Sequence, residues 1–324
     1  MFIQAARRGQ NDWWRWLLMI AFIVIGITAG SFPISAVALQ VAEANGTAAE
    51  LSEYFASMNP ELLGMDPKLN LVLLILPFAC ALTAMLVGVR VLHGRPATSL
   101  ISPLDRVDWG RVAWAFGVWL GLALLIEGLA FAASISNYTI NLGFDWIWLF
   151  LVCLLLVPLQ TSAEEVFFRG YLWQGIGLLA PAGWVPLVIT TVLFSVPHLA
   201  NPEAAEYGWF PSLLLYAGAG LLLGLVTLFD DRLELALGIH AATNIFAAAF
   251  VSYKAAVIQT PALLIANDLN IWLAVAVFYL AAGLFFWLAH RRYGLLSNWR
   301  EKLFSPLTKI EKPLPTSDHF TDPV

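Results

Sequence analysis

The sequence predicts an all-α fold, a polytopic membrane helical bundle of about eight transmembrane helices. The first reason is composition: of the 324 residues, 60% are hydrophobic and only 12% are charged, and the mean hydropathy of +0.77 lies far above that of soluble domains. The second reason is that apolar runs of about 20 residues, the length that crosses a bilayer, recur along nearly the whole chain. We therefore expect a single transmembrane domain over residues 1–290, followed by a polar, poorly ordered cytoplasmic tail over residues 291–324.

Each expected span is an apolar run bounded by polar residues. The first follows three arginines, as a signal peptide would, but its apolar run is too long for a signal sequence, so we expect it to be retained. The spans are expected near residues 16–41, 69–92, 112–134, from 146 onwards, around 185–196, 211–229, 233–251 and 271–289.

Basic and acidic residues fall in alternate loops, which predicts the orientation. Loops rich in Lys and Arg remain in the cytoplasm, so both termini are expected there, in the plasma membrane of the cell. The basic residues that decide this are Arg7, Arg8 and Arg15 before the first span, Arg90, Arg95, Arg106 and Arg111 between the second and third, and Arg291, Arg292, Arg300 and Lys302 after the last.

The composition also bounds the partners. The net charge is −5, and no basic stripe with interleaved aromatic residues occurs, so the lipid bilayer is an expected partner and nucleic acid is not. Cys80 and Cys153 lie in separate apolar runs, where a disulfide framework or a zinc site with thiolate ligands is not expected.

Three charges interrupt the fourth span, in the segment SAEEVFFRG at residues 162–170. A charge within the hydrocarbon costs at least about 2–3 kcal/mol, so such residues indicate function unless they only line a polar bundle interior. Glu165 and Arg169 are four residues apart and can pair on one helix face, which gives them a supporting structural role. Glu164 is turned about 100° away from Glu165 and is left for another partner.

Two histidines and an asparagine lie in later spans, in FSVPH at residues 194–198 and GIHAATN at residues 238–244. His240 and Asn244 are four residues apart and share a helix face, so they can act on one bound atom. Glu164 and His198 are each 17 residues from Pro181, in the turn between their spans, and should lie at matching depth. A lone buried histidine is usually a satisfied core residue, but two histidines on different spans indicate a shared polar site.

These side chains suit hydrolysis in two ways. His198 and His240, possibly with Glu164, could bind Zn²⁺ and lower the pKa of a bound water to about 7. Alternatively, Glu164 and His198 could orient and deprotonate water without a metal, while His240 and Asn244 donate hydrogen bonds to the oxyanion. Neither an HExxH nor a GxSxG motif occurs in the chain, so zincin and serine-hydrolase chemistry is not expected.

The segments EEVFFR, FSVPH and HAATN match, in order and spacing, the motifs EExxxR, FxxxH and HxxxN. The chain thereby resembles the CPBP family of intramembrane metalloproteases, the CAAX-protease and bacteriocin-processing family, similar to type II CAAX prenyl endopeptidases. The resemblance covers residues 146–251, the expected protease core, and implies a cytosol-facing cavity and peptide-bond hydrolysis. Carried over by position, Glu164 would activate water, His198 and His240 would bind metal or assist, and Asn244 would stabilise the oxyanion.

The expected activity is that of an intramembrane metalloendopeptidase, a CAAX-protease-like hydrolase with zinc as a possible cofactor. A site within the bilayer favours a hydrophobic or membrane-anchored peptide as substrate, and prenylation of that peptide would rest on analogy alone. The first alternative is a non-catalytic bacteriocin-immunity or binding protein of the same fold, which retention of Glu164 and both histidines disfavours. The second is a proton-coupled transporter, which often shows two related halves, and no internal repeat is visible here.

Overall fold

The computed structural model describes residues 1–307, apart from residues 105 and 254. Nearly all of this part of the chain is helical, and two of the segments, η6 and η7, are π-helical. The elements, in order, are η1 Phe2–Arg8, α1 Trp13–Asn45, η2 Ala48–Glu50, α2 Leu51–Ser57, η3 Pro60–Leu63, α3 Pro67–Val91, η4 Ala97–Leu100, α4 Trp109–Ala133, η5 Ile135–Asn137, β1 Tyr138–Ile140, α5 Phe144–Glu165, η6 Val166–Leu172, α6 Trp173–Leu179, α7 Trp184–His198, α8 Pro202–Tyr207, α9 Trp209–Asp230, α10 Glu234–Ile245, η7 Phe246–Phe250, β2 Val251–Tyr253, β3 Leu264–Ala266, α11 Ile271–Tyr293 and α12 Trp299–Phe304.

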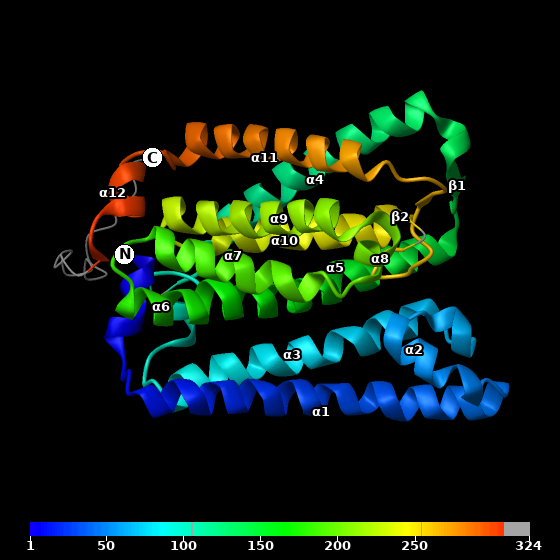
Figure 1. Ribbon diagram of the computed structural model, residues 1–324, viewed down its shortest axis with the longest axis horizontal. Coiled ribbons are helices and arrows are strands. Elements are labelled where there is room, and N and C mark those ends of the chain that lie inside the picture. Colours follow the sequence, from blue (N-terminus) through cyan, green and yellow to red (C-terminus); the bar gives the residue numbers. More distant parts are fainter. Residues whose placement is uncertain (105, 254, 308–324) are drawn as a thin grey trace.

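The long helices lie side by side in three layers (Figure 1). Helices α1 and α3 form one outer layer, and α3 also packs on α5. The middle layer contains α5, α7, α9 and α10, and α4 and α11 form the third layer against α10 and α9. This arrangement encloses the middle layer between two apolar layers.

The expected membrane bundle is confirmed. Within the described residues, six helices are long and apolar enough to cross a bilayer, and two apolar helices are shorter. The shorter ones, Trp184–His198 and Glu234–Phe250, coincide with the fifth and seventh expected spans. At 1.5 Å per residue, the 15 residues of α7 extend about 22 Å, less than the roughly 30 Å of a hydrocarbon core. Helix α7 therefore ends inside the bundle, at His198.

Close contact between α1 and α3 depends on two glycines, Gly26 and Gly30, that are one helical turn apart. A Cβ atom built at Gly30 would lie 2.6 Å from the Cα of Pro77 and 2.7 Å from the carbonyl oxygen of Leu76. At Gly26 it would lie 3.0 Å from the carbonyl oxygen of Cys80. Small residues at this spacing let two membrane helices approach closely, because apolar side chains gain nothing by leaving lipid.

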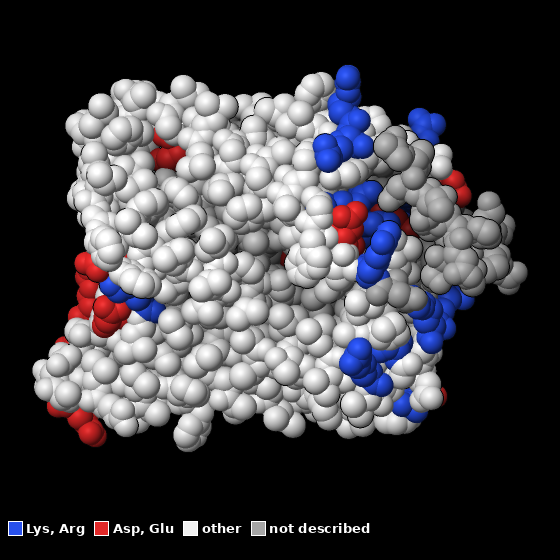
Figure 2. Space-filling model, turned by 180° about the vertical axis from the view of Figure 1, so that it is seen from behind, with Lys and Arg blue, Asp and Glu red and all other residues white. Residues whose placement is uncertain are grey.

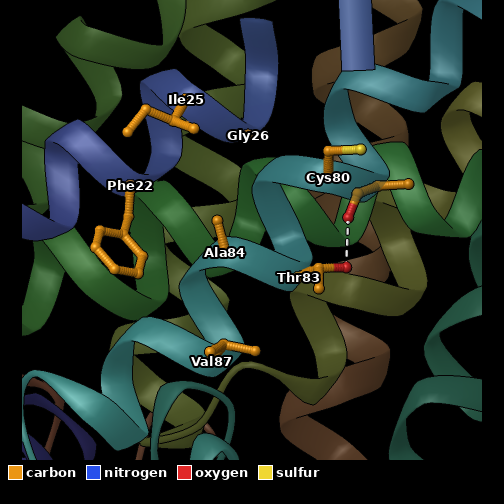
Figure 3. A pocket seen from close by; sticks show the side chains of 8 residues that line it. Phe22, Ile25, Gly26, Cys80, Thr83, Ala84 and Val87 are labelled. Carbon is orange, nitrogen blue, oxygen red and sulfur yellow. Dashed lines mark hydrogen bonds between the residues drawn. The ribbon is translucent and has the colours of Figure 1, made fainter. Parts of the chain in front are cut away.

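A hollow of about 530 Å³ opens beside this contact (Figure 3). It contains no residue of the predicted site, and the Thr83 hydroxyl donates to the Ala79 carbonyl of its own helix instead of pointing a free polar atom into the space. The hollow is therefore an apolar surface suited to lipid. Its lining residues are Phe22, Ile25, Gly26, Ala79, Cys80, Thr83, Ala84 and Val87.

The connections at one end of the bundle are more ordered than the sequence indicates. Between α1 and α3, the short elements η2, α2 and η3 bury Tyr54 and Leu63 against the ends of both helices. On the other side, β1 and β2 pair with β3 in a three-stranded sheet of order β1-β3-β2. Its strands are only three residues long, too short for an alternating pattern to be read from sequence.

The opposite end carries most of the Lys and Arg side chains, whereas acidic side chains gather at the end of the short sheet (Figure 2). We call the end that is rich in Lys and Arg the basic end. The N-terminal segment η1 and helix α12 lie there, as Figure 1 shows. The sequence predicts a poorly ordered tail from residue 291, but the chain is packed on the bundle up to residue 307. The Leu295 and Leu307 side chains are buried, and the Leu307 amide donates to the Pro181 carbonyl. Residues 308–324 lie outside the described part of the chain.

Buried polar residues join the layers at the basic end. The His93 ring, in the connection after α3, hydrogen-bonds through Nδ1 to the Gln10 carbonyl and through Nε2 to the Tyr171 hydroxyl. The nearby Arg95 guanidinium donates to the side chains of Gln174 and Ser99. Burial lowers the pKa of Arg95 to about 10, so it stays charged at neutral pH. These contacts hold the end of α3 against η6 and α6.

We predict that replacing Gly30 with Ala destabilises the protein by about 1–3 kcal/mol, the usual cost of overpacking, because the new methyl group meets the α3 backbone. The matched control is Gly121→Ala in α4, where a Cβ atom meets nothing within 4 Å and better helix propensity should leave stability unchanged or slightly raised. Thermal unfolding in detergent measures both. Equal midpoints would show that the α1–α3 contact does not depend on Gly30.

Candidate active site

Helix α5 carries the two glutamates at its end, where the helix widens. Glu165 is the last residue of α5, and the π-helical segment η6 begins at Val166. A second π-helical segment, η7, begins at Phe246, two residues after Asn244. Single turns of π-helix inside α-helices occur frequently at functional sites. Both helices that carry the central site residues are interrupted in this way.

Glu165 is fully buried and holds two partners from different helices. Its Oε1 atom accepts a hydrogen bond of 2.8 Å from Arg169 Nη1, so the ion pair expected from the spacing forms. The same oxygen accepts a second bond of 2.8 Å from His240 Nδ1, which the sequence reading had not included. Because a carboxylate only accepts, Nδ1 carries the proton and Nε2 is left for other contacts.

Glu164 faces the other nitrogen of the same histidine. Its Oε2 atom lies 3.7 Å from His240 Nε2 and has no hydrogen-bond partner in the described structure, although it is buried. Its Oε1 atom accepts a bond of 2.5 Å from Gln160 Nε2. One oxygen of Glu164 is thus held by the protein, and the other remains open beside an imidazole.

Asn244 reaches Glu164 through Gln160. The Asn244 amide donates to Gln160 Oε1 at 2.9 Å, and Gln160 in turn donates to Glu164. Gln160 was missed in the sequence analysis. Its position four residues before Glu164 places both on one helix face. A glutamine within an apolar span is itself a sign of a polar site, so Gln160 could have been found from the sequence.

His198 approaches the site from the end of α7 but does not join the hydrogen-bonded group. Its Nδ1 atom donates to the Phe194 carbonyl at 2.6 Å, which leaves Nε2 for other contacts. Among the described residues, no hydrogen bond or ion pair connects His198 to Glu164 or His240. The structure therefore brings together Glu164, His240 and Asn244 and places His198 beside them.

Phe194 contacts both histidines. Its ring centroid lies 4.5 Å from that of His198 and 5.9 Å from that of His240. The Arg169 guanidinium lies over the same ring at 4.4 Å, in cation–π geometry. Phe168 also contacts Phe194, at 5.5 Å, and each is 13 residues from Pro181. This contact agrees with the matching depth expected for the two helices.

The donor set does not match a zinc site. A zinc ion requires at least three protein ligands at about 2 Å, commonly from His, Cys, Asp or Glu. Within the described residues, no group of three or more such side chains could hold a metal ion. Glu164 and His240 supply two facing donors, and the third predicted ligand, His198, has no contact with either.

Comparison with known proteins identifies the family of this chain. The family described as type II CAAX prenyl endopeptidase Rce1-like matches residues 143–246, which include α5, α7, α9 and α10. The chain is also 31% identical over 256 residues to the uncharacterized protein YyaK of Bacillus subtilis strain 168, covering 76% of this chain and 80% of that relative. The chain belongs to the Rce1-like family. No solved structure matches it.

The match to the Rce1-like family covers the part of the chain that forms the site. The match ends at residue 246, immediately after Asn244, and begins at the first turn of α5. Helices α1 and α3 lie outside the family match, although the similarity to YyaK, at three quarters of the chain, extends well beyond it.

We predict that Glu165→Gln costs about 3–5 kcal/mol of unfolding free energy, because it leaves the buried Arg169 guanidinium without its counter-charge. Glu164→Gln should cost much less, since Glu164 has no ion pair with Arg or Lys. The exposed Glu53→Gln serves as the control for a lost surface charge. Denaturant unfolding in micelles compares the three, and equal losses for Glu164 and Glu165 would contradict the assigned difference.

Proposed function

We propose that the protein is an intramembrane endopeptidase that hydrolyses a peptide bond near the cytoplasmic membrane face with water activated by Glu164. The observation that carries this proposal is the open Oε2 atom of Glu164, buried and 3.7 Å from His240 Nε2. A carboxylate oxygen left without a partner in an apolar bundle is costly, and a bound water would satisfy it. Family membership supports a membrane endopeptidase in general.

The proposed reaction starts from a water beside Glu164 and His240. The distance of 3.7 Å between Oε2 and Nε2 is too long for a direct hydrogen bond and too short for a water on the line between them, so the water is placed to one side, within hydrogen-bond reach of both atoms. Glu164 Oε2 takes a proton as the water oxygen attacks the peptide carbonyl carbon. The same carboxyl then gives the proton to the leaving amine as the carbon–nitrogen bond breaks. Glu164 ends the cycle ionised, and no other proton donor is required.

The developing oxyanion requires hydrogen-bond donors. Asn244 uses one of its two amide hydrogens for Gln160, so the second is available for substrate. His240 has Nδ1–H committed to Glu165, so a proton on Nε2 would point to the same space. A single donor to an oxyanion is worth about 10²- to 10³-fold in rate. We assign this role to Asn244 and His240.

His198 is proposed to assist from the substrate side. Its Nε2 atom is free to accept a hydrogen bond because Nδ1 is bonded to the Phe194 carbonyl. Its ring has no hydrogen bond or ion pair with Glu164 or His240 among the described residues, so we assign its contact to bound peptide or its water rather than to the Glu164 carboxylate.

A zinc-assisted reaction remains the alternative raised by the motifs. It would require His198 Nε2 to move into contact with the Glu164–His240 pair, since the described residues form no three-donor set. We therefore derive no step through a metal. Elemental analysis of purified protein, with and without His198→Ala, tests this: stoichiometric zinc that His198→Ala removes would establish the metal-dependent route.

The substrate is proposed to be a hydrophobic or membrane-anchored peptide. The site residues lie on helices of the middle layer, within a molecule whose central band is almost free of charged side chains (Figure 2). A soluble peptide would have to leave water to reach them. The concentration of Lys and Arg at one end supports an orientation in the plasma membrane with both termini in the cytoplasm.

We predict that Glu164→Gln lowers turnover of membrane peptides by about 10²- to 10⁴-fold, the usual contribution of a general base, with little loss of stability. The measurement is a mass-spectrometric comparison of peptides released from membranes that contain wild-type or Glu164→Gln protein. Undiminished release would show that Glu164 is not the base. Absence of any wild-type cleavage, with binding retained, would instead favour an immunity or binding role.

We predict that Gln160→Leu lowers kcat by about 10- to 100-fold, because Glu164 and Asn244 lose the amide that fixes their geometry. Gln40→Leu on the exposed face of α1 is the matched control and should retain full activity. Steady-state kinetics on a peptide identified by the membrane comparison distinguish the two variants. Equal kcat values would remove Gln160 from the site.

A further inference from the structure

One side of the His198 ring is covered by a tyrosine. Tyr216, on α9, lies with its ring centroid 4.8 Å from that of His198, and the two rings are tilted by 39°. Phe194 lies 4.5 Å from the same imidazole with a tilt of 34°. No ring contact joins Phe194 to Tyr216 among the described residues, so the two rings flank His198 from different sides.

Tyr216 is itself held by the connection between α7 and α9. The Asn201 amide donates to the Tyr216 hydroxyl at 3.0 Å, and the Glu203 carboxylate lies close to that hydroxyl. Glu203 is 8% exposed and accepts hydrogen bonds from the Val257 amide at 2.9 Å and the Tyr253 hydroxyl at 3.3 Å. A chain of polar contacts therefore runs from the connection after β2 to the ring that covers His198.

We propose that Tyr216 is a positioning residue for His198, whose imidazole it clamps against Phe194 so that Nδ1 stays on the Phe194 carbonyl and Nε2 faces the site. The effect of this orientation on catalysis rests on the function proposed above. The orientation of the ring itself can be measured without any substrate.

Two contacts determine how the imidazole can turn. The torsion that rotates a histidine ring is broad and roughly two-fold, so the ring can flip unless neighbours prevent it. A flip would move Nδ1 away from the Phe194 carbonyl and break the 2.6 Å hydrogen bond. With Tyr216 in place, aromatic rings contact the imidazole from two directions. Without the Tyr216 ring, one face opens and the hydrogen bond alone must hold the orientation.

The surrounding charges do not supply a second clamp. The ionisable groups around this pair of rings are Glu203, which lies near the Tyr216 hydroxyl, and Arg169 and His240, which contact Phe194. None of them forms a hydrogen bond or ion pair with His198 within the described part of the chain. Aromatic packing and one backbone bond thus orient this histidine.

The test measures which nitrogen of His198 carries the proton. Full-length protein with ¹⁵N-labelled histidine is studied by NMR in detergent micelles, and the His198 signal is identified by its loss in His198→Ala. The variants are Tyr216→Leu, which removes the ring, Tyr216→Phe, which removes only the hydroxyl, and Tyr279→Leu as the matched control. Tyr279 lies on α11 and donates to the Leu214 carbonyl of α9, but it has no ring contact with His198.

Wild type, Tyr216→Phe and Tyr279→Leu are expected to show one tautomer, with the proton on Nδ1. Tyr216→Leu is expected to show a mixture of both tautomers at an unchanged unfolding midpoint. A single Nδ1–H tautomer in folded Tyr216→Leu would overturn the proposal, as would a mixture in Tyr279→Leu. Should Tyr216→Leu not fold, Tyr216→Met serves as the second variant and is judged by the same two outcomes.

The kinetic consequence separates this proposal from the proposed function. On the peptide identified by the membrane comparison, Tyr216→Leu should lower kcat by about 10- to 100-fold with KM within about twofold, and Tyr216→Phe should restore most of the loss. A tautomer mixture with unchanged kcat would confirm the clamp but refute a role for His198 orientation in turnover. If Glu164→Gln proved fully active, the endopeptidase mechanism would fail while the tautomer result still stood.

Discussion

The arrangement of the site depends on one buried carboxylate. Glu165 accepts hydrogen bonds from Arg169 and His240, and Arg169 also donates to the Gly220 carbonyl, so α5, η6, α9 and α10 meet around this group. Removing either charge alone would leave the other unpaired in an apolar interior, at a cost of several kcal/mol. The Glu165–Arg169 pair is therefore unlike a surface ion pair, which contributes little to stability. It links this helix to α9 and α10 through contacts that span 51 and 75 positions of the chain.

This division of roles leaves Glu164 available for chemistry. Two adjacent glutamates on a helix point about 100° apart, and here Glu165 pairs with the arginine while Glu164 accepts from Gln160. His240 lies between them, with one ring nitrogen on each side. Glu165, whose charge is balanced by Arg169, thus fixes the orientation of His240. The other ring nitrogen of His240 then faces the free oxygen of Glu164.

Much of the fold and part of the site could be predicted from the sequence, and the contacts that could not be predicted have physical reasons. The spans follow from hydropathy, and the Glu165–Arg169 pair follows from helical spacing within one element. The contact between His240 and Glu165 joins residues 75 positions apart, which no local spacing determines. The orientation of His198 depends on Phe194 and Tyr216, whose rings contact the imidazole, and Tyr216 lies on a different helix that the motif does not include. Gln160 was recognisable as a polar residue in an apolar run, but its partner Asn244 depends on how α10 packs on α5.

The π-helical segment after Glu165 has a consequence for how the chain can change. A π-helical turn accommodates one residue more than the α-helical turn it replaces. Losing one residue from Val166–Leu172 could therefore restore a regular α-helical turn and leave the helix beyond in nearly its present orientation. Losing one residue from a regular α-helical turn would instead rotate everything beyond by about 100°. Tyr171 and Gln174 keep their contacts with His93 and Arg95 only in the first case, so the π-helical segment is where this helix can change its length and still hold the end of α3.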